Sequence, residues 1–303
     1  MKTIEGLSIL IPIYNRVVID LARDLHHQAL TSGIEFEILC YDDFSTDDIR
    51  QRHANHTFPS HTTYRELDRN HGRSAIRNLL ASNARYSHLL FLDCDSKIIL
   101  SDFIRSYISY PQYKVVIGGR VYSPTAPSES QLYLHWLIGT SKEVLSAGQR
   151  GLHPYQSLMF NNILIEKDTF LSIRLDETIK GYGHEDSLFG YMLKQKNIVI
   201  SHIDNPVEHE SLDTNDEFLK KSREAVRNLA YLVNQYALGK DTRLFRSYHF
   251  LRRYGAASIY KSIFARWESQ AISNLLGGNP RPIWLDLLKL FWFMEDMSRS
   301  KED

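Results

Sequence analysis

Cysteine is scarce in this 303-residue sequence: Cys40 and Cys94 are the only two, and both lie within apolar stretches. They cannot form a disulfide framework and are too few for a cysteine-based zinc site. An excess of one charge is also missing, because 36 Lys and Arg balance 36 Asp and Glu. Without a net positive charge, the chain lacks the field that draws nucleic-acid-binding proteins to their partner. We therefore expect a protein of a reducing compartment that has no nucleic-acid partner.

Long apolar runs are missing as well. Pro12 and Asn15 interrupt the first apolar stretch within a few residues, which is unlike a signal peptide. The longest later stretch, LLKLFWFM at residues 287–294, is too short to span a bilayer. These features predict a cytoplasmic protein, which could still work at the inner face of the membrane.

Apolar strand-like runs alternate with helical patterns in the first two thirds of the chain. Residues 8–13 (SILIPI), 35–41 (EFEILCY) and 88–93 (HLLFLD) are typical of buried strands, and residues 18–29 and 72–84 have helical spacing. This alternation predicts an α/β fold with a mostly parallel central sheet and helices on both faces.

Further elements follow with less regular spacing. Residues 114–122 (KVVIGGRVY) indicate a strand pair, and residues 161–165 a strand. Residues 185–196 indicate a helix with Leu188, Phe189, Met192 and Leu193 inward. From about residue 215 the pattern is helical and rich in aromatic residues and arginine. We predict a catalytic domain at residues 1–214 and a helical extension at residues 215–303.

Polar residues gather just after the expected strands, at Tyr14-Asn15-Arg16, Asp42-Asp43 and Asp93-Cys94-Asp95. Ligands of such sheets bind beyond the carboxyl ends of the strands. In extended backbone, Asp93 and Asp95 project to one side and could share a hard divalent cation, with a substrate diphosphate completing its ligands. The alternative is a solvated strand end with two incidental acids.

The segment GYGHEDSLFGYML at residues 181–193 contains the strongest pattern. Gly181 and Gly183 permit a tight turn, and Glu185 with Asp186 follow at the start of a helix, where free amides favour negative charge. Such acids could simply stabilise the helix. They could also provide a carboxylate that takes a proton from a substrate hydroxyl.

Five segments taken together, SILIPIYNR, YDDFSTDD, GRSAIRN, FLDCDS and GYGHEDSLFGYML, occur in the order found in family 2 glycosyltransferases. The last two resemble bacterial polysaccharide synthases of the chondroitin polymerase type. The resemblance implies the GT-A nucleotide-sugar fold and an inverting, metal-dependent transfer of a sugar to a hydroxyl of a glycan or lipid-linked acceptor. It covers about the first two thirds of the chain.

Residue by residue, the resemblance implies a nucleotide pocket after the first strand, lined by Pro12, Tyr14 and Arg16. Asp43 would accept a hydrogen bond from the base, and uridine is the base that the family favours. Phe44 departs from the pattern, because the family usually has glycine at this position.

The resemblance also implies a diphosphate and metal site. Arg73 and Arg77 would face the diphosphate or the sugar, Asp93 would touch ribose or metal, and Asp95 would bind Mn²⁺ or Mg²⁺ directly. Arg77 could equally be a structural ion-pair partner. His209 would be a further metal ligand.

His202 competes with His209 for the metal role, and we favour His209 because it lies in a polar loop beyond a strand. For the acceptor side, the resemblance implies that Asp186 is the base and that Glu185 orients the acceptor.

Three alternatives stay open at this point. A sugar-nucleotide nucleotidyltransferase would need a glycine-rich phosphate loop after the first strand, and PIYNR has no glycine. A non-catalytic module that binds a sugar nucleotide or a glycan would usually lack one of the acids. The aromatic and basic helices at the end of the chain could contact a membrane, or they could pack against the catalytic domain or a partner subunit.

Overall fold

The computed structural model describes residues 3–179, 181–236, 238–239 and 242–299. The chain divides into two compact units. The first contains Met1–Ser123, Glu143–Thr178 and Glu185–Ser211, and the second contains Pro124–Lys142, Ile179–His184 and Leu212–Asp303. Two short excursions to the second unit therefore interrupt the first two thirds of the chain. Our domain boundary at residues 214 and 215 stays a prediction.

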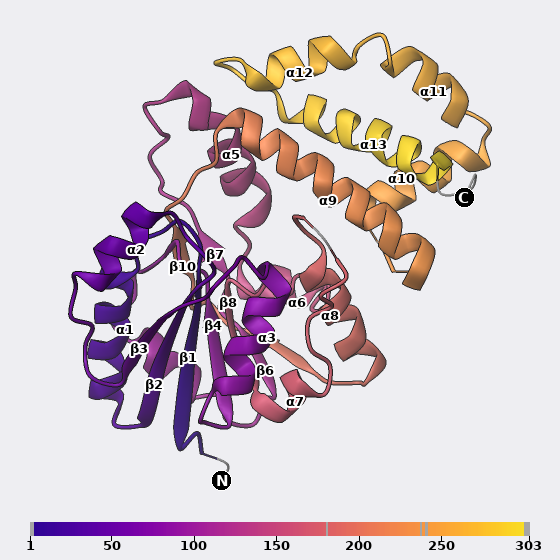
Figure 1. Cartoon of the computed structure of the whole chain (residues 1–303). Coiled ribbons are helices and arrows are strands. Elements are labelled where there is room, and N and C mark those ends of the chain that lie inside the picture. The colour runs from indigo at the N-terminus through magenta and orange to yellow at the C-terminus, as the bar shows by residue number, and fades with distance from the viewer. Residues whose placement is uncertain (1–2, 180, 237, 240–241, 300–303) are drawn as a thin grey trace. The chain divides into compact units, whose positions relative to one another are not determined.

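A seven-stranded sheet forms the centre of the first unit, in the order β3-β2-β1-β4-β8-β6-β9 (Figure 1). Its strands are β1 (Gly6–Ile13), β2 (Glu35–Asp42), β3 (Thr62–Glu66), β4 (His88–Leu92), β6 (Val115–Ile117), β8 (Asn162–Glu166) and β9 (Ile200–His202). Only β8 runs antiparallel to its neighbours, β4 and β6. The expected α/β fold with a mostly parallel sheet is confirmed.

Helices cover both faces of this sheet. They are α1 (Ile19–Ser32), α2 (Asp47–Ala54), α3 (Arg73–Asn83), α4 (Phe103–Ile108), α6 (Ala147–Gly151), α7 (Lys167–Leu171) and α8 (Glu185–Gln195). Because side chains alternate along a strand, Ile9 and Ile11 of β1 pack with α1 and α4, while Leu10 packs with α3, α7 and α8. The sheet therefore lies between two hydrophobic cores, one on each face.

A small second sheet in the same unit joins β5 (Ser96–Ile98), β10 (Val207–His209) and β7 (Arg120–Val121). β10 is antiparallel to β5, and His209 is paired with Ser96. This pairing brings a segment from residues 207–209 to the turn that contains Asp93 and Asp95.

The second unit is helical. Its elements are η1 (Ser130–Leu132), α5 (Tyr133–Ile138), α9 (Asn215–Tyr236), α10 (Arg243–Arg253), α11 (Ala257–Phe264), α12 (Glu268–Leu276) and α13 (Pro282–Arg299), and the π-helical turn η2 (Gly139–Glu143) follows α5. Leu288, Phe291 and Phe293 of α13 are buried in its core. Within the described ranges, no helix is both long enough and apolar enough to cross a membrane.

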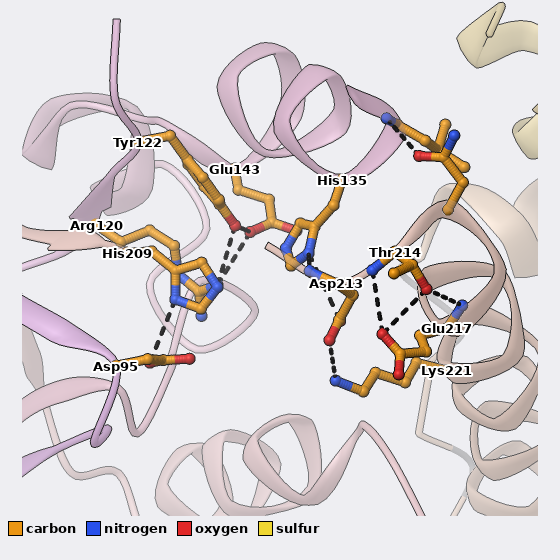
Figure 2. Close-up of polar contacts among 12 residues, drawn as sticks. Asp95, Arg120, Tyr122, His135, Glu143, His209, Asp213, Thr214, Glu217 and Lys221 are labelled. Atoms are coloured by element: carbon orange, nitrogen blue, oxygen red, sulfur yellow. Dashed lines mark hydrogen bonds and ion pairs between the residues drawn. The ribbon is translucent and has the colours of Figure 1, made fainter. Parts of the chain in front are cut away.

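A capping box begins α9 at Asn215. The Thr214 hydroxyl accepts a hydrogen bond from the Glu217 amide, and the Glu217 carboxylate accepts one from the Thr214 amide (Figure 2). Two amides that the helix itself cannot satisfy are thereby paired. The change of pattern near residue 215 thus coincides with a strong helix start.

Two local expectations were wrong. Met192 was expected inward, but its side chain is 37% exposed, while Leu188, Phe189 and Leu193 are buried as expected. The strand pair expected at residues 114–122 consists of β6 and β7, which belong to different sheets. Gly118 and Gly119 separate these two strands, and Gly119 has a positive φ of 89°.

Candidate active site

The loop after β1 contains the residues expected to line the nucleotide pocket: Pro12 at the end of the strand, then Tyr14 and Arg16, which are both exposed. Asn15 between them has a φ of 53° and ties this loop to the one after β2. Its amide donates to the Ser45 hydroxyl at 2.8 Å, and its Oδ1 accepts from the Thr46 amide at 2.9 Å. The two loops therefore form one bonded edge beyond the strand ends.

Asp43 is buried at this edge, and both of its carboxylate oxygens already accept backbone amides. The amides are those of His71 at 2.7 Å and Gly72 at 2.9 Å, immediately before α3. Asp43 thus anchors the start of α3. A nucleobase would have to use the remaining lone pairs of this carboxylate, and the role of Asp43 in base recognition stays a prediction.

Phe44 has a backbone conformation that favours glycine. Its φ is 66°, a left-handed value that costs a residue with a Cβ atom about 1–2 kcal/mol. Its ring is 46% exposed, and the Arg50 guanidinium lies 5.2 Å from the ring centroid. The departure in sequence therefore adds an exposed aromatic ring next to Asp43.

Arg77 and Asp93 form an ion pair. Nη2 of Arg77 lies 2.5 Å from Oδ1 of Asp93, and only 5% of the Arg77 side chain is exposed. Nη1 of Arg77 donates to the backbone oxygen of Arg73. In the protein without ligands, Arg77 thus has the structural role that we kept as an alternative, and it holds the Asp93 carboxylate.

Asp95 faces His209 instead (Figure 2). Oδ1 of Asp95 lies 3.4 Å from Nδ1 of His209, and this buried oxygen has no hydrogen bond of ordinary geometry among the described residues. Burial alone would raise the pKa of Asp95, but His209, Arg120 and Arg16 outweigh it and lower that pKa. His209 thus lies against Asp95 and, with Arg120 and Arg16, favours its ionised form.

His202, the competing histidine, has other partners. Its Nε2 lies 3.1 Å from the Pro154 carbonyl oxygen, and its Nδ1 accepts from Nε of Arg150 at 3.3 Å. Burial lowers the pKa of His202. The structure thus brings His209, and not His202, to Asp95.

Three residues beside His209 were missed in the sequence. The rings of Tyr122 and His209 meet edge to face, with centroids 5.3 Å apart, and the Tyr122 hydroxyl donates to Glu143 at 2.6 Å (Figure 2). Arg120 donates to the same Glu143 oxygen at 3.1 Å. Glu143 lies more than 20 residues after Tyr122 in the sequence, and no sequence pattern predicted this cluster.

Glu185 and Asp186 begin α8, as expected, but their surroundings differ. Glu185 is 5% exposed and accepts from Nε of Arg73 at 2.8 Å. Burial would raise the pKa of Glu185, but Arg73 and Arg77 outweigh it and lower that pKa. The surroundings of Glu185 therefore favour its charged form.

Asp186 has the opposite shift. Burial of its carboxylate, followed by the repulsion of Glu185, raises the pKa of Asp186 to about 7. The one hydrogen bond seen at this carboxylate comes from the Phe160 amide to Oδ2, at 3.2 Å. A carboxyl group with a pKa near neutrality is suited to accept and release a proton.

The beginning of β8 links the two groups of acids. Phe160 holds Asp186, and the next residue, Asn161, accepts from the Asp93 amide with its carbonyl oxygen at 3.3 Å. Asn162 is paired with Leu92 at the end of β4. The adjacent residues Phe160 and Asn161 therefore contact Asp186 and Asp93, and Asp93 in turn pairs with Arg77.

The described side chains alone do not form a complete site for a divalent cation. No group of three or more His, Cys, Asp or Glu side chains in the described part of the chain is arranged to hold a metal ion. Mg²⁺ and related ions in phosphate-transfer sites, however, use one or two protein carboxylates, with phosphates and water as the other ligands. The underbonded Asp95 oxygen next to His209 fits such a site, whereas Asp93 is engaged by Arg77.

Several solved structures resemble this chain in fold. Mannosyl-3-phosphoglycerate synthase from Rubrobacter xylanophilus matches with a TM-score of 0.54 and 18% identity, over 77% of this chain and 75% of its own. The mannosyltransferase PcManGT from Pyrobaculum calidifontis, in complex with GDP-Man and Mn²⁺, matches with a TM-score of 0.54 and 11% identity, over 94% and 85%. S. aureus TarS in complex with UDP-GlcNAc gives 0.48 and 15% identity, over 98% and 92%.

A comparison with curated protein sequences finds no match. The family model described as glycosyl transferase family 2 matches residues 8–163, just over half of the chain. This match includes Asp43, Asp93 and Asp95 and ends before Asp186 and His209. The GT-A fold, the order of the strand-end acids and this match agree, and the chain belongs to glycosyl transferase family 2.

Proposed function

We propose that this glycosyltransferase moves a sugar from a nucleoside diphosphate sugar, in the first instance a UDP sugar, to a hydroxyl group with inversion at the anomeric carbon. The divergent pKa values of Glu185 and Asp186 carry the proposal. Neighbouring titratable groups whose environments push their pKa values apart are characteristic of acid and base assignments. Membership of a glycosyltransferase family disfavours the nucleotidyltransferase alternative.

Asp186 is the proposed base. Its carboxylate takes the proton of the acceptor hydroxyl, the hydroxyl oxygen forms a bond to the anomeric carbon, and the bond from that carbon to the diphosphate breaks. The proton ends on Asp186, and the electron pair leaves with the nucleoside diphosphate. Positioned general bases typically contribute ~10²–10⁴-fold to the rate.

Asp95 and His209 are the proposed holders of a divalent cation, which, when bound, would neutralise charge on the departing diphosphate. Arg16 and Arg120, whose charges lower the pKa of Asp95, add positive charge at the same place. Arg73 is 42% exposed while it holds Glu185, so its guanidinium can also reach a ligand. Preorganised charge of this kind stabilises a leaving group as it departs.

Glu185 is proposed to orient the acceptor. The acceptor that we propose is a glycan or lipid-linked hydroxyl used in bacterial surface polysaccharide synthesis, at the cytoplasmic face of the membrane. This choice follows the resemblance to polysaccharide synthases.

The donor is tested by thermal stabilisation. The full chain is heated with UDP sugars and with GDP-mannose, each with Mn²⁺ and with EDTA, because the mannosyltransferase of similar fold is in complex with GDP-Man and Mn²⁺. A ligand that binds only the folded state raises the melting temperature. We expect a rise with a UDP sugar that requires metal. A rise with GDP-mannose alone would correct the nucleotide.

The reaction is tested by donor hydrolysis. Slow, metal-dependent release of nucleoside diphosphate, reduced ~10²-fold or more in Asp186→Asn, would support the proposal. Metal-dependent donor binding without any release, with or without added glycan acceptors, would instead favour a module that only binds sugar nucleotides.

A further inference from the structure

Residues 243–267 of the second unit differ from the rest of the chain in charge. They contain five arginines, one lysine and no aspartate or glutamate, in a protein whose total formal charge is zero. The rest of the chain therefore has a balancing negative excess. Four of these arginines, Arg243, Arg246, Arg252 and Arg253, are exposed on α10. This segment is a local cationic surface on a neutral protein.

Large apolar side chains are exposed on the same segment. Phe250 is 60% exposed and Tyr254 is 68% exposed, and their ring centroids lie 4.8 Å apart. Phe250 follows the buried Tyr248 by two residues, which in a helix places it on the opposite side from the core. The outer face of α10 therefore presents Phe250 between Arg246 and Arg253, which lie four residues before it and three after it, and Tyr254 follows at the end of the helix.

A second exposed row runs along α11. Ile259 and Ile263 are 61% and 55% exposed. Trp267 lies beyond the end of α11 and is 51% exposed, and one side of its ring stacks on Trp284 of α13 with centroids 6.3 Å apart. Tyr260 and Phe264 pack inward, and the Tyr260 hydroxyl donates to the Leu287 carbonyl oxygen of α13. The core of the unit is thus complete without Ile259 and Ile263.

We propose that these exposed faces of α10 and α11, which we call the cationic helical surface (residues 243–267), bind an anionic lipid membrane. Helices of this kind place Trp, Phe, Tyr and aliphatic side chains at the boundary between headgroups and acyl chains, while arginines contact anionic lipids. Long basic side chains extend to the headgroups as the apolar residues bury. The match in charge is the reason to choose an anionic membrane.

Two other occupants fit less well. A second copy of this chain, packed through the same surface, would bring six basic residues against six others with no acid between them. A single-stranded nucleic acid would use the arginines and stacked aromatic rings, but it would leave Ile259 and Ile263 in water. Both are outcomes of the test below.

The test is sedimentation of the full chain with vesicles of phosphatidylcholine alone and of phosphatidylcholine with phosphatidylglycerol, without donor. We expect binding to the anionic vesicles to be at least about tenfold tighter, and to weaken when salt is raised. Equal binding to both vesicles, or none, would overturn the proposal. So would a concentration-dependent dimer in light scattering, or tight binding of an oligonucleotide, in a protein that does not bind vesicles.

Matched variants locate the surface. Ile259→Asn with Ile263→Asn, and separately Arg246→Gln with Arg253→Gln, should each weaken vesicle binding by about tenfold or more. The controls are Val199→Asn, which is 63% exposed in the first unit, and Lys194→Gln with Lys196→Gln. Controls that weaken binding as much as the test variants would also overturn the proposal.

This inference deepens the proposed function, since it places the enzyme next to a lipid-linked acceptor, but its test is independent of catalysis. Donor hydrolysis is measured on the same preparations. Loss of vesicle binding with hydrolysis intact contradicts only the membrane surface, and vesicle binding without hydrolysis contradicts only the proposed chemistry.

Discussion

Glu185 and Asp186 are consecutive residues, yet the protein shifts the pKa values of their carboxyl groups in opposite directions. Arg73 and Arg77 keep the pKa of Glu185 low despite burial, whereas burial and Glu185 itself raise the pKa of Asp186 to about 7. The Glu185 carboxylate accepts a hydrogen bond from the Arg73 guanidinium, whereas the Asp186 carboxylate accepts one from the Phe160 backbone amide. Two adjacent carboxyl groups with pKa values shifted in opposite directions therefore share the first turn of α8.

The pH dependence of the rate follows from Asp186. As a base it must be ionised, so the rate at saturating donor should rise with pH and level off above about 7. Asp186→Asn should reduce the rate ~10²–10⁴-fold and remove this rise from the residual activity. Steady-state rates between pH 5 and 9 check it, and an unchanged profile in the variant would assign the base elsewhere.

Asp186 should also lower stability at high pH. Its folded pKa lies above its unfolded value, so the unfolded chain loses this proton first, and stability falls as pH rises from about 4 to about 7. Asp186→Asn can still accept the Phe160 amide and carries no charge. Its melting temperature should therefore exceed that of the wild type by more at pH 8 than at pH 5, in the absence of ligand. The opposite order would show that burial does not penalise this carboxylate.

Metal dependence should follow Asp95 and His209. Asp95→Asn and His209→Ala should each lose the stabilisation that Mn²⁺ adds in the presence of donor, which thermal melts with and without EDTA would measure. His202→Gln is the matched histidine control, because its ring contacts Pro154 and Arg150 instead. If the control loses the metal effect and His209→Ala keeps it, the two histidines exchange roles.

Removing Arg77 should be costly for the fold. Arg77→Met leaves Asp93 without its partner, and breaking a buried ion pair from one side costs about 3–5 kcal/mol. Chemical denaturation would measure the loss. Lys220→Met is the comparison, because its ion pair with Asp216 is exposed on both sides, at 72% and 58%, and its loss should cost less. Equal losses would mean that burial of the Arg77 pair does not matter.

Backbone strain at Phe44 gives a prediction that depends on one Cβ atom. Phe44→Gly and Phe44→Ala both remove the ring and its contact with Arg50, but only glycine adopts a φ of 66° without strain. The glycine variant should therefore be the more stable of the two by about 1 kcal/mol. Denaturant midpoints of the pair decide it, and an alanine variant of equal stability would indicate that this turn relaxes.

The strands of the large sheet could be predicted where long apolar runs specify buried strands, as in β1, β2 and β4. The small sheet could not, because three-residue strands such as β5 and β10 have no periodicity to detect. Its formation depends on pairing between residues more than 80 positions apart, for example His209 with Ser96.

The candidate site, like the fold, could be predicted only in part from the sequence. Acids at strand ends were recognisable from their neighbours in sequence, and so were Glu185 and Asp186. The anchoring of Asp43 by amides near residue 71 and the contact of Glu143 with Tyr122 depend on tertiary structure alone. Sequence therefore identified the titratable groups and not the partners that set their protonation.

The adjacent positions of Phe160 and Asn161 constrain how the sequence of this enzyme can change. One of these adjacent residues supports the base candidate Asp186, and the other supports the turn of Asp93. Deleting or inserting a single residue in this link would displace the proposed base and the Asp93 turn at once. Substitutions outside the link leave the spacing of the two carboxylates intact, so the proposed acceptor side can vary more readily there.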